Sequence, residues 1–291
     1  MRQLIFYTFC IALLLTACQG KREGNERLIS VTIEPERYIA EQIAGEFYQI
    51  NCVIPDGQSP ETYDPTPQEM ILIGKSKAYL RIGDIGFEQA WMKAIKEQNP
   101  SMQIFDLSKG IHLIATQEPN EHAEAHAHHH GPTDPHIWTS AQNMKIIARN
   151  AAEAFITLDP ENKNHYEENY TRLITQIERT KQELDNLLIP LKGQAFIIYH
   201  PALTYLARDY QLKQLCIEMD GKEPSPAQLK TLVETARKYQ ATTVFVQQEF
   251  DQKNAELIAK ETGCRLIQIN PLEYDWAKSM IHIAKSLAHG K

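Results

Sequence analysis

The sequence has no run of basic residues, no CxxC pair and, after its first 18 residues, no apolar stretch of membrane-spanning length. Its formal net charge of -7, together with the lack of interleaved aromatic and basic residues, argues against a nucleic-acid partner. Beyond Cys18 only Cys52, Cys216 and Cys264 remain, an odd number that indicates neither a disulfide framework nor a structural zinc knot. Cys216 and Cys264 lie in the same half of the chain and could pair.

The first 18 residues have the layout of a secretory signal, because Arg2 precedes an apolar run and small residues that end at Cys18. The apolar run is shorter than the about 20 residues of a membrane span. The segment LTAC at 15–18 resembles the bacterial lipoprotein cleavage box, in which the cysteine becomes the lipidated first residue. The alternative is an ordinary cleaved signal. With residues 19–27 as a polar tether, we expect an extracytoplasmic protein anchored by lipid to a bacterial membrane, on its periplasmic face or at the cell surface.

Strand-like and helix-like segments alternate along the remaining chain, whose about 270 residues are enough for two lobes. Apolar, β-branched segments predict strands in the first half at 28–33, 50–54, 78–83 and 102–107. In the second half they predict strands at 195–199, 214–219, 242–247 and 265–269. Helices are expected between the strands, in the first half at 36–49, 67–76, 86–97 and 141–157. This alternation is typical of parallel βαβ units, so each half is predicted to be an open α/β lobe.

One long helix is predicted between the halves. Asp159 and Pro160 provide an N-cap and first turn, and an apolar stripe then continues to Pro190. About 30 residues at about 1.5 Å each span about 45 Å, more than the width of a small lobe. We therefore expect a strut over 159–189 that joins lobes at 28–158 and 190–291, the alternative being a packing helix within one domain.

Three stretches place polar residues just after predicted strands, where parallel α/β sheets bind ligands. The first is GQSPETYDPTPQ at 57–68, which prolines stiffen and in which Glu61 is the central ionisable group. The second is DPHIW at 134–138, where a proline fixes the backbone before His136. In the third, His200 ends a buried strand and a proline follows it. Taken singly, these residues are more typical of a structural histidine and a solvated carboxylate.

Taken together, these stretches resemble the metal-binding solute receptors of bacterial ABC importers for zinc and manganese, in the group with a rigid helical backbone. The segments DPHIW and YHPALTYLARDY, in this order and at this separation, are the strongest signal. Further similar segments are SPETYDPTP, DPENKNHYEENYTRL, EPSPAQL, VFVQQEF and INPLEYDW, so the resemblance covers nearly the whole mature chain. It implies two α/β lobes, a metal in the cleft between them, and delivery to a membrane permease with its ATPase.

The resemblance places His136 and His200 at the second and third ligand positions. Glu61 stands where members usually carry histidine, and Asn270 where they often carry an acidic residue. Histidine at the third position is typical of zinc receptors, and glutamate of manganese receptors. Two imidazoles and one carboxylate suit tetrahedral Zn²⁺, whereas Mn²⁺ favours more oxygen ligands. We predict that Glu61, His136 and His200 bind Zn²⁺ and that Asn270 or a water molecule is the fourth ligand. The alternative ion is Mn²⁺. The alternative site is a pair of histidines without Glu61.

Residues 121–130 carry five histidines with no apolar neighbours that could bury them: His122, His126, His128, His129 and His130. An unperturbed histidine side chain has a pKa of about 6.5, so these imidazoles are expected to be mostly neutral at pH 7. Such a tract resembles the accessory zinc-scavenging loop of the zinc receptors. We predict modest zinc affinity for it, the alternative being a solvated insertion without a metal role.

Two other functions fit parts of the sequence. A metallohydrolase also uses two histidines and a glutamate, but it needs a general base, and no HExxH motif is present. Glu249 and Asp275 fall near the expected cleft, although nothing in the sequence places either beside the metal. A metal-storing or adhesive surface lipoprotein is the second alternative, because permease contacts have no recognisable motif. We expect a receptor without enzymatic activity that acts as a monomer.

Overall fold

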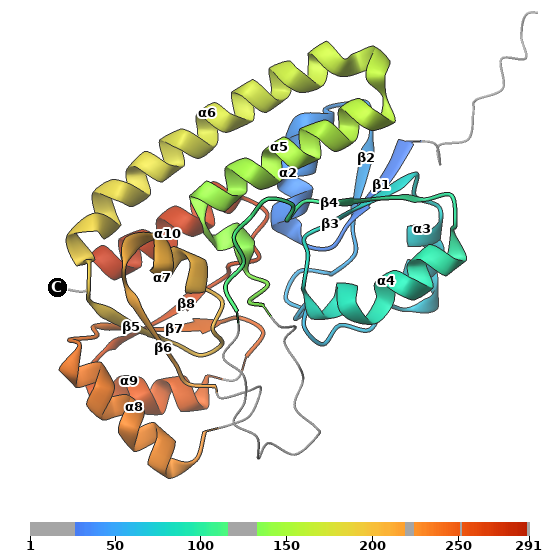
Figure 1. Cartoon of the computed structure of the whole chain (residues 1–291). Coiled ribbons are helices and arrows are strands. Elements are labelled where there is room, and N and C mark those ends of the chain that lie inside the picture. Colours follow the sequence, from blue (N-terminus) through green and yellow to red (C-terminus); the bar gives the residue numbers. More distant parts are fainter. Residues whose placement is uncertain (1–26, 116–132, 219–223, 251, 290–291) are drawn as a thin grey trace, which may run out of the picture.

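The computed structural model describes residues 27–115, 133–218, 224–250 and 252–289. They form two lobes, each built on a four-stranded parallel sheet, joined by one long helix (Figure 1). The predicted fold class is therefore confirmed. In this part of the chain no helix is both long and apolar enough to cross a membrane. Several predicted residues lie outside the described ranges: Cys18, His122, His126, His128, His129 and His130.

The first sheet has the strand order β2-β1-β3-β4. Its strands are β1 (Leu28–Val31), β2 (Gln49–Cys52), β3 (Ala78–Arg81) and β4 (Gln103–Asp106). The helices between them are α2 (Glu34–Ala44), α3 (Pro67–Gly74) and α4 (Gly86–Gln98). Helix α2 ends earlier than residue 49, where the helical pattern was predicted to end, because Gly45 takes a φ of 58° and turns the chain toward β2.

The second sheet repeats this topology with the order β6-β5-β7-β8. Its strands are β5 (Ala195–Ile198), β6 (Lys213–Cys216), β7 (Thr243–Gln247) and β8 (Arg265–Ile269). Its helices are α7 (Thr204–Tyr210), α8 (Pro226–Lys238), α9 (Lys253–Thr262) and α10 (Trp276–Ala288). Cys216 ends one edge strand and Cys264 precedes the opposite edge strand, so these two thiols do not pair, and both are free.

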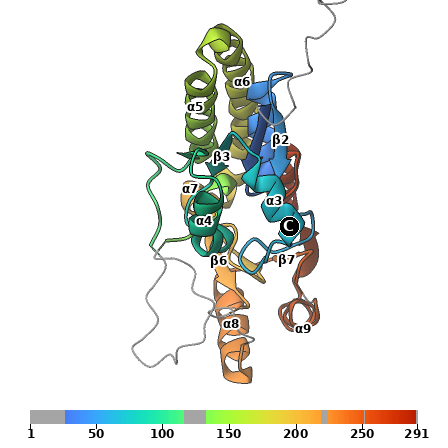
Figure 2. The ribbon, with the colours of Figure 1, turned by 90° about the vertical axis from the view of Figure 1, so that its right-hand side faces the viewer.

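The two lobes are joined by α6 (Lys163–Leu188), which follows α5 (Ala141–Leu158), the last helix of the first lobe. Helix α6 has 26 residues and therefore a length of about 39 Å. Most of its predicted apolar stripe is buried: Tyr166, Leu173, Ile177, Leu184 and Leu188. It packs against α2 and α5 in the first lobe and against α10 in the second (Figure 1). Figure 2 shows α5 and α6 side by side. The helix thus contacts both lobes, as expected of a strut.

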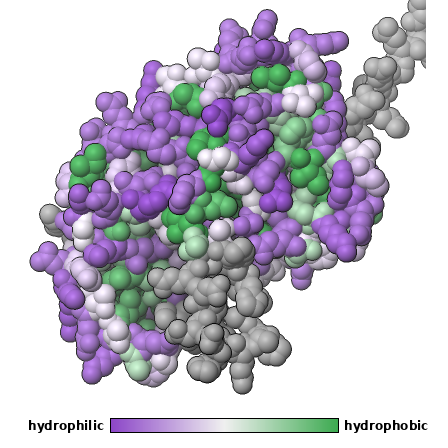
Figure 3. All heavy atoms as spheres, in the orientation of Figure 1, coloured by the Kyte–Doolittle hydropathy of each residue, from purple (hydrophilic) through white to green (hydrophobic). Residues whose placement is uncertain are grey.

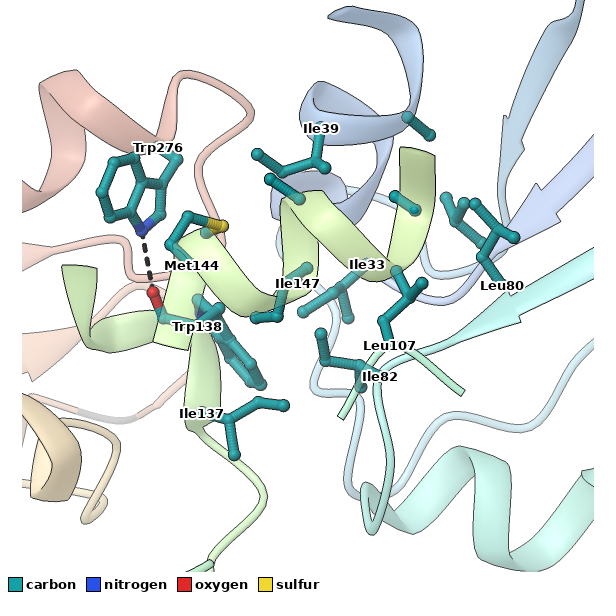
Figure 4. Close-up of a cluster of buried hydrophobic side chains, with 14 of the residues drawn as sticks. Ile33, Ile39, Leu80, Ile82, Leu107, Ile137, Trp138, Met144, Ile147 and Trp276 are labelled. Atoms are coloured by element: carbon teal, nitrogen blue, oxygen red, sulfur yellow. Dashed lines mark hydrogen bonds between the residues drawn. The ribbon is translucent and has the colours of Figure 1, made fainter. Parts of the chain in front are cut away.

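A single apolar core extends from the first lobe into the second (Figure 4). Two buried tryptophans lie where the lobes meet. The Trp138 Nε1–H donates to the Pro271 carbonyl at 3.0 Å, and the Trp276 Nε1–H donates to the Trp138 carbonyl at 2.8 Å. A smaller cluster, which includes Val244 and Ile258, packs on the other face of the second sheet.

The face of the molecule in Figure 3 is largely hydrophilic, and its apolar residues lie in separate groups. Large exposed apolar side chains come from several different elements: Ile71, Leu72, Ile104, Ile189 and Leu257. Scattered residues of this kind are normal on a folded protein and indicate no binding surface by themselves.

Two buried glutamates hold the ends of β1 and β3. Glu36 accepts from the Thr32 backbone N–H at 2.9 Å. Glu88 accepts from the backbone N–H groups of Ile82 at 2.8 Å and Gly83 at 2.9 Å, and from the Thr32 hydroxyl. Burial raises the pKa of Glu88 to about 7. Burial and then the nearby Glu88 raise the pKa of Glu36. The Glu88 carboxyl ties the first turn of α4 to the ends of β1 and β3, and α4 in turn contacts the loop that carries Glu61.

We expect Glu88→Gln to weaken the dependence of stability on pH. A carboxyl with a raised pKa binds more protons in the folded than in the unfolded state between pH 4.5 and about 7. The free energy of unfolding contributed by Glu88 should therefore fall as pH rises through this range. Urea denaturation of the metal-free wild type and variant at pH 5 and pH 8 measures the effect. An equal difference between the two proteins at both pH values would contradict it.

Candidate metal centre

Three of the predicted ligands converge between the lobes. Glu61, His136 and His200 each offer a ligand atom, and these atoms lie within 4.8 Å of one another. The Nε2 atoms of His136 and His200 are 3.3 Å apart. Both imidazoles are buried and Glu61 is half-buried, so the group is largely shielded from water. His136 lies in the segment just before α5, and His200 follows the end of β5.

The cavity between these side chains has a volume of about 10 Å³. This is room for about one water-sized particle, so it suits a single ion and excludes an organic ligand. Its lining residues are Ser59, Pro60, Glu61, His136, Trp138, His200, Ala202, Glu249, Phe250, Pro271 and Leu272. Most of these are apolar, which strengthens the electrostatic interactions of any cation held there.

Helix α4 holds the loop that carries Glu61. The Pro60 carbonyl accepts from the Phe87 backbone N–H at 2.9 Å. Gly86 allows this close approach, because a Cβ at that position would lie 2.6 Å from the Glu61 carbonyl oxygen and 3.0 Å from Glu61 Oε2. A side chain at position 86 would therefore displace the carboxylate from the site.

Asp134 orients the imidazole of His136. Asp134 Oδ1 lies 2.9 Å from His136 Nδ1 and also accepts the His136 backbone N–H at 2.9 Å. Burial alone would raise the pKa of Asp134, but His136 lowers it through its charge and these hydrogen bonds. The Tyr205 hydroxyl donates to the Asp134 carbonyl at 2.7 Å and fixes the segment further. Nε2 of His136 is thus the ring nitrogen that faces the cavity and can bind a metal.

His200 has an equivalent arrangement. Its Nδ1 lies 3.3 Å from Glu218 Oε2, and the Gln247 side-chain amide donates to its backbone carbonyl at 2.8 Å. Burial lowers the pKa of His200, with the Glu218 hydrogen bond acting in the opposite direction. A neutral imidazole is the form that binds a metal. The Phe250 ring stacks on the imidazole with centroids 5.2 Å apart.

Asp134 and Glu218 were not among the predicted site residues. Glu218 comes two positions after the end of β6, the same offset at which His200 follows the neighbouring strand β5. An acidic residue at this position after a predicted strand was the sequence feature from which Glu218 could have been predicted as a site residue. The signal for Asp134 was its position in DPHIW, two residues before His136.

Asn270 is not among the residues that line the cavity. Its Oδ1 accepts from the Leu272 backbone N–H at 2.9 Å, and its Nδ2 lies 3.5 Å from Asp56 Oδ1 in the other lobe. Glu249 does line the cavity, and burial raises its pKa while the charge of His136 acts to lower it. The structure therefore brings together Glu61, His136 and His200 and leaves the predicted Asn270 outside this group.

Histidine and glutamate side chains in this arrangement can hold a divalent cation. Each imidazole presents one nitrogen to the cavity and has a carboxylate behind it. Such outer carboxylates fix the ring orientation and make the ligand nitrogen more basic. The chemistry of the site is therefore metal binding.

Known proteins are similar to this chain in sequence and in fold. Residues 29–290 match the family described as zinc-uptake complex component A, periplasmic. A crystal structure of ZnuA aligns with a TM-score of 0.82 and 35% identity, covering 90% of this chain and 97% of that one. The manganese ABC transporter substrate-binding lipoprotein PsaA of Streptococcus mitis is 27% identical over 275 residues, 89% of this chain and 85% of PsaA.

The zinc-binding lipoprotein AdcA of Streptococcus pneumoniae is 24% identical over 277 residues, which are 93% of this chain and 55% of AdcA. The family match spans nearly all of the described residues, and the ZnuA fold is shared over the same length. Members of this family are receptors and not enzymes, so a metallohydrolase is excluded. The chain belongs to the zinc-uptake complex component A family and is a metal-binding receptor of an ABC importer.

Proposed function

We propose that the protein is an extracytoplasmic zinc receptor that captures Zn²⁺ with Glu61, His136 and His200 and delivers it to the permease of an ABC importer. The main support is the 3.3 Å separation between the two Nε2 atoms, one from each side of the cleft. Zn–N distances of about 2.0–2.1 Å put tetrahedral ligand atoms about 3.3–3.4 Å apart. The two nitrogens are thus already spaced for zinc.

The donor atoms favour zinc over manganese. Relatives named for zinc and relatives named for manganese are both similar to this chain, so similarity does not choose between the ions. Two buried imidazoles with a carboxylate suit a four-coordinate borderline ion, whereas manganese prefers oxygen ligands and higher coordination. The small cavity also favours a low coordination number.

The sequence supports two further parts of the proposal. The LTAC box at 15–18 indicates that a lipid on Cys18 anchors the protein to a membrane. The relatives PsaA and AdcA carry the description lipoprotein. The histidine tract at 121–130 is proposed to collect zinc with modest affinity and to pass it to the single tight site.

His136→Ala and His200→Ala should abolish tight zinc binding. Zinc at about 1,000 times its Kd stabilises a one-site protein by about 4 kcal/mol, and each variant should lose most of this. Glu218→Gln keeps the shape of the side chain and should weaken binding by about 10–100-fold. Urea denaturation with and without zinc, and competition with manganese, measure these effects. Zinc stabilisation of His200→Ala equal to that of the wild type would refute the proposed site.

Deletion of residues 121–130 should remove weak, multiple zinc binding and leave the tight site intact. The tract ends shortly before His136 in the sequence, but none of its histidines is needed to complete the proposed coordination. Calorimetric titration should show loss of the shallow phase only. Loss of the tight phase instead would mean that a tract histidine is a ligand of the main site.

Cys18→Ser should release the protein from membranes or block its processing, because serine has no thiol to carry the lipid. Cell fractionation and labelling with a fatty acid measure the effect. The protein with the native Cys18 serves as the control. A serine variant that still partitions with membranes and carries the label would contradict lipidation at this residue.

A further inference from the structure

We propose that the carboxylate of Glu249 is the fourth metal ligand, in the position predicted for Asn270. This inference rests on the proposed function, because it completes the same site. The ligand atoms of Glu61, His136 and His200 already lie within 4.8 Å of one another. Glu249 lies outside this group, so the proposal includes a rotation of its side chain toward the cation as the cation binds.

The strand order brings Glu249 to the site. Strands β6, β5 and β7 are neighbours in a parallel sheet and end at the same edge. An ionisable residue follows each strand at the second position: Glu218 after β6, His200 after β5 and Glu249 after β7. Glu218 contacts His200 Nδ1, and Glu249 lines the cavity that His200 Nε2 faces. His200 is thus flanked by a carboxylate from each neighbouring strand.

Asn270 is engaged elsewhere. Its amide oxygen, the only atom with which the side chain could bind a metal, accepts from the Leu272 backbone N–H. Its amide nitrogen points to Asp56 Oδ1, which also accepts from Gln248 Nε2 at 3.0 Å. Asn270 therefore links the two lobes and shapes the Leu272 wall of the cavity.

The charge of its carboxylate also favours Glu249 over the neutral side chain of Asn270. Asp134 and Glu218 already place negative charge behind the two imidazoles, and Glu249 would add a charged oxygen in direct contact with the cation. A direct contact of this kind is strengthened in a small cavity with mostly apolar walls. Within the described lining of this cavity, Glu61 and Glu249 are the carboxylates available. The register of β7 with β8 pairs Gln247 with Ile269, so the sites after these strands are adjacent. Glu249, after β7, can therefore take the fourth ligand position that was predicted for Asn270, after β8.

The test compares Glu249→Gln with Asn270→Ala as the matched control. We expect Glu249→Gln to weaken zinc binding by more than about tenfold, as Glu61→Gln should, and Asn270→Ala to leave it nearly unchanged. Competition titration with a chromophoric zinc chelator measures the affinity. The absorption spectrum of the Co²⁺-loaded protein should change in Glu249→Gln and not in Asn270→Ala. Unchanged melting of each metal-free variant shows that the fold is intact.

Two outcomes would overturn the proposal. Weaker binding in Asn270→Ala, with wild-type affinity and an unchanged cobalt spectrum in Glu249→Gln, would assign the ligand to Asn270. Wild-type behaviour of both variants would assign the fourth position to water. Failure of the proposed function is a separate result, because it would appear as wild-type zinc affinity in His200→Ala whatever Glu249 does.

Discussion

The hydrogen bonds of two buried tryptophans determine how the lobes are joined. Trp276 donates to the Trp138 carbonyl, and Trp138 donates to the Pro271 carbonyl. Trp138 is two residues from His136, and Pro271 lines the metal cavity, so the bonds that close the core also set the width of the site. Leaving such a buried donor without a partner costs about 1–3 kcal/mol. The separation of the ligands is therefore coupled to the stability of the whole core.

A shared core restricts how the protein can respond to a metal. Side chains of α5, α6 and α10 belong to one apolar cluster that spans both lobes, and a large rotation of the lobes would expose it. The proposed ligands, in contrast, come from segments outside the long helices. Glu61 lies in a loop, and His200 and Glu249 follow strand ends. Movement on binding is therefore expected in these side chains and short segments more than in the lobes, which differs from receptors that close about a flexible hinge.

Much of this could be predicted from the sequence. The alternation of short apolar strands with helices gave the two lobes, and the long apolar stripe identified α6. Glu61, His136 and His200 were predicted because their flanking segments resemble those of a known family. Glu218 and Glu249 were not assigned, because their contacts depend on the order β6-β5-β7, which periodicity does not determine. The role of Asn270 depends on a loop hydrogen bond to Leu272 that no sequence pattern indicates.

Gly86 makes the metal site sensitive to a helix that supplies none of its ligands. The backbone of α4 lies so close to Glu61 that a single methyl group at position 86 would overlap the loop. The position of the Glu61 carboxylate therefore follows the position of α4. Substitutions on the side of α4 away from the cavity can shift the helix slightly and so change affinity in small steps while every ligand is kept. Receptors for ions of different abundance could arise from this fold by such remote adjustment.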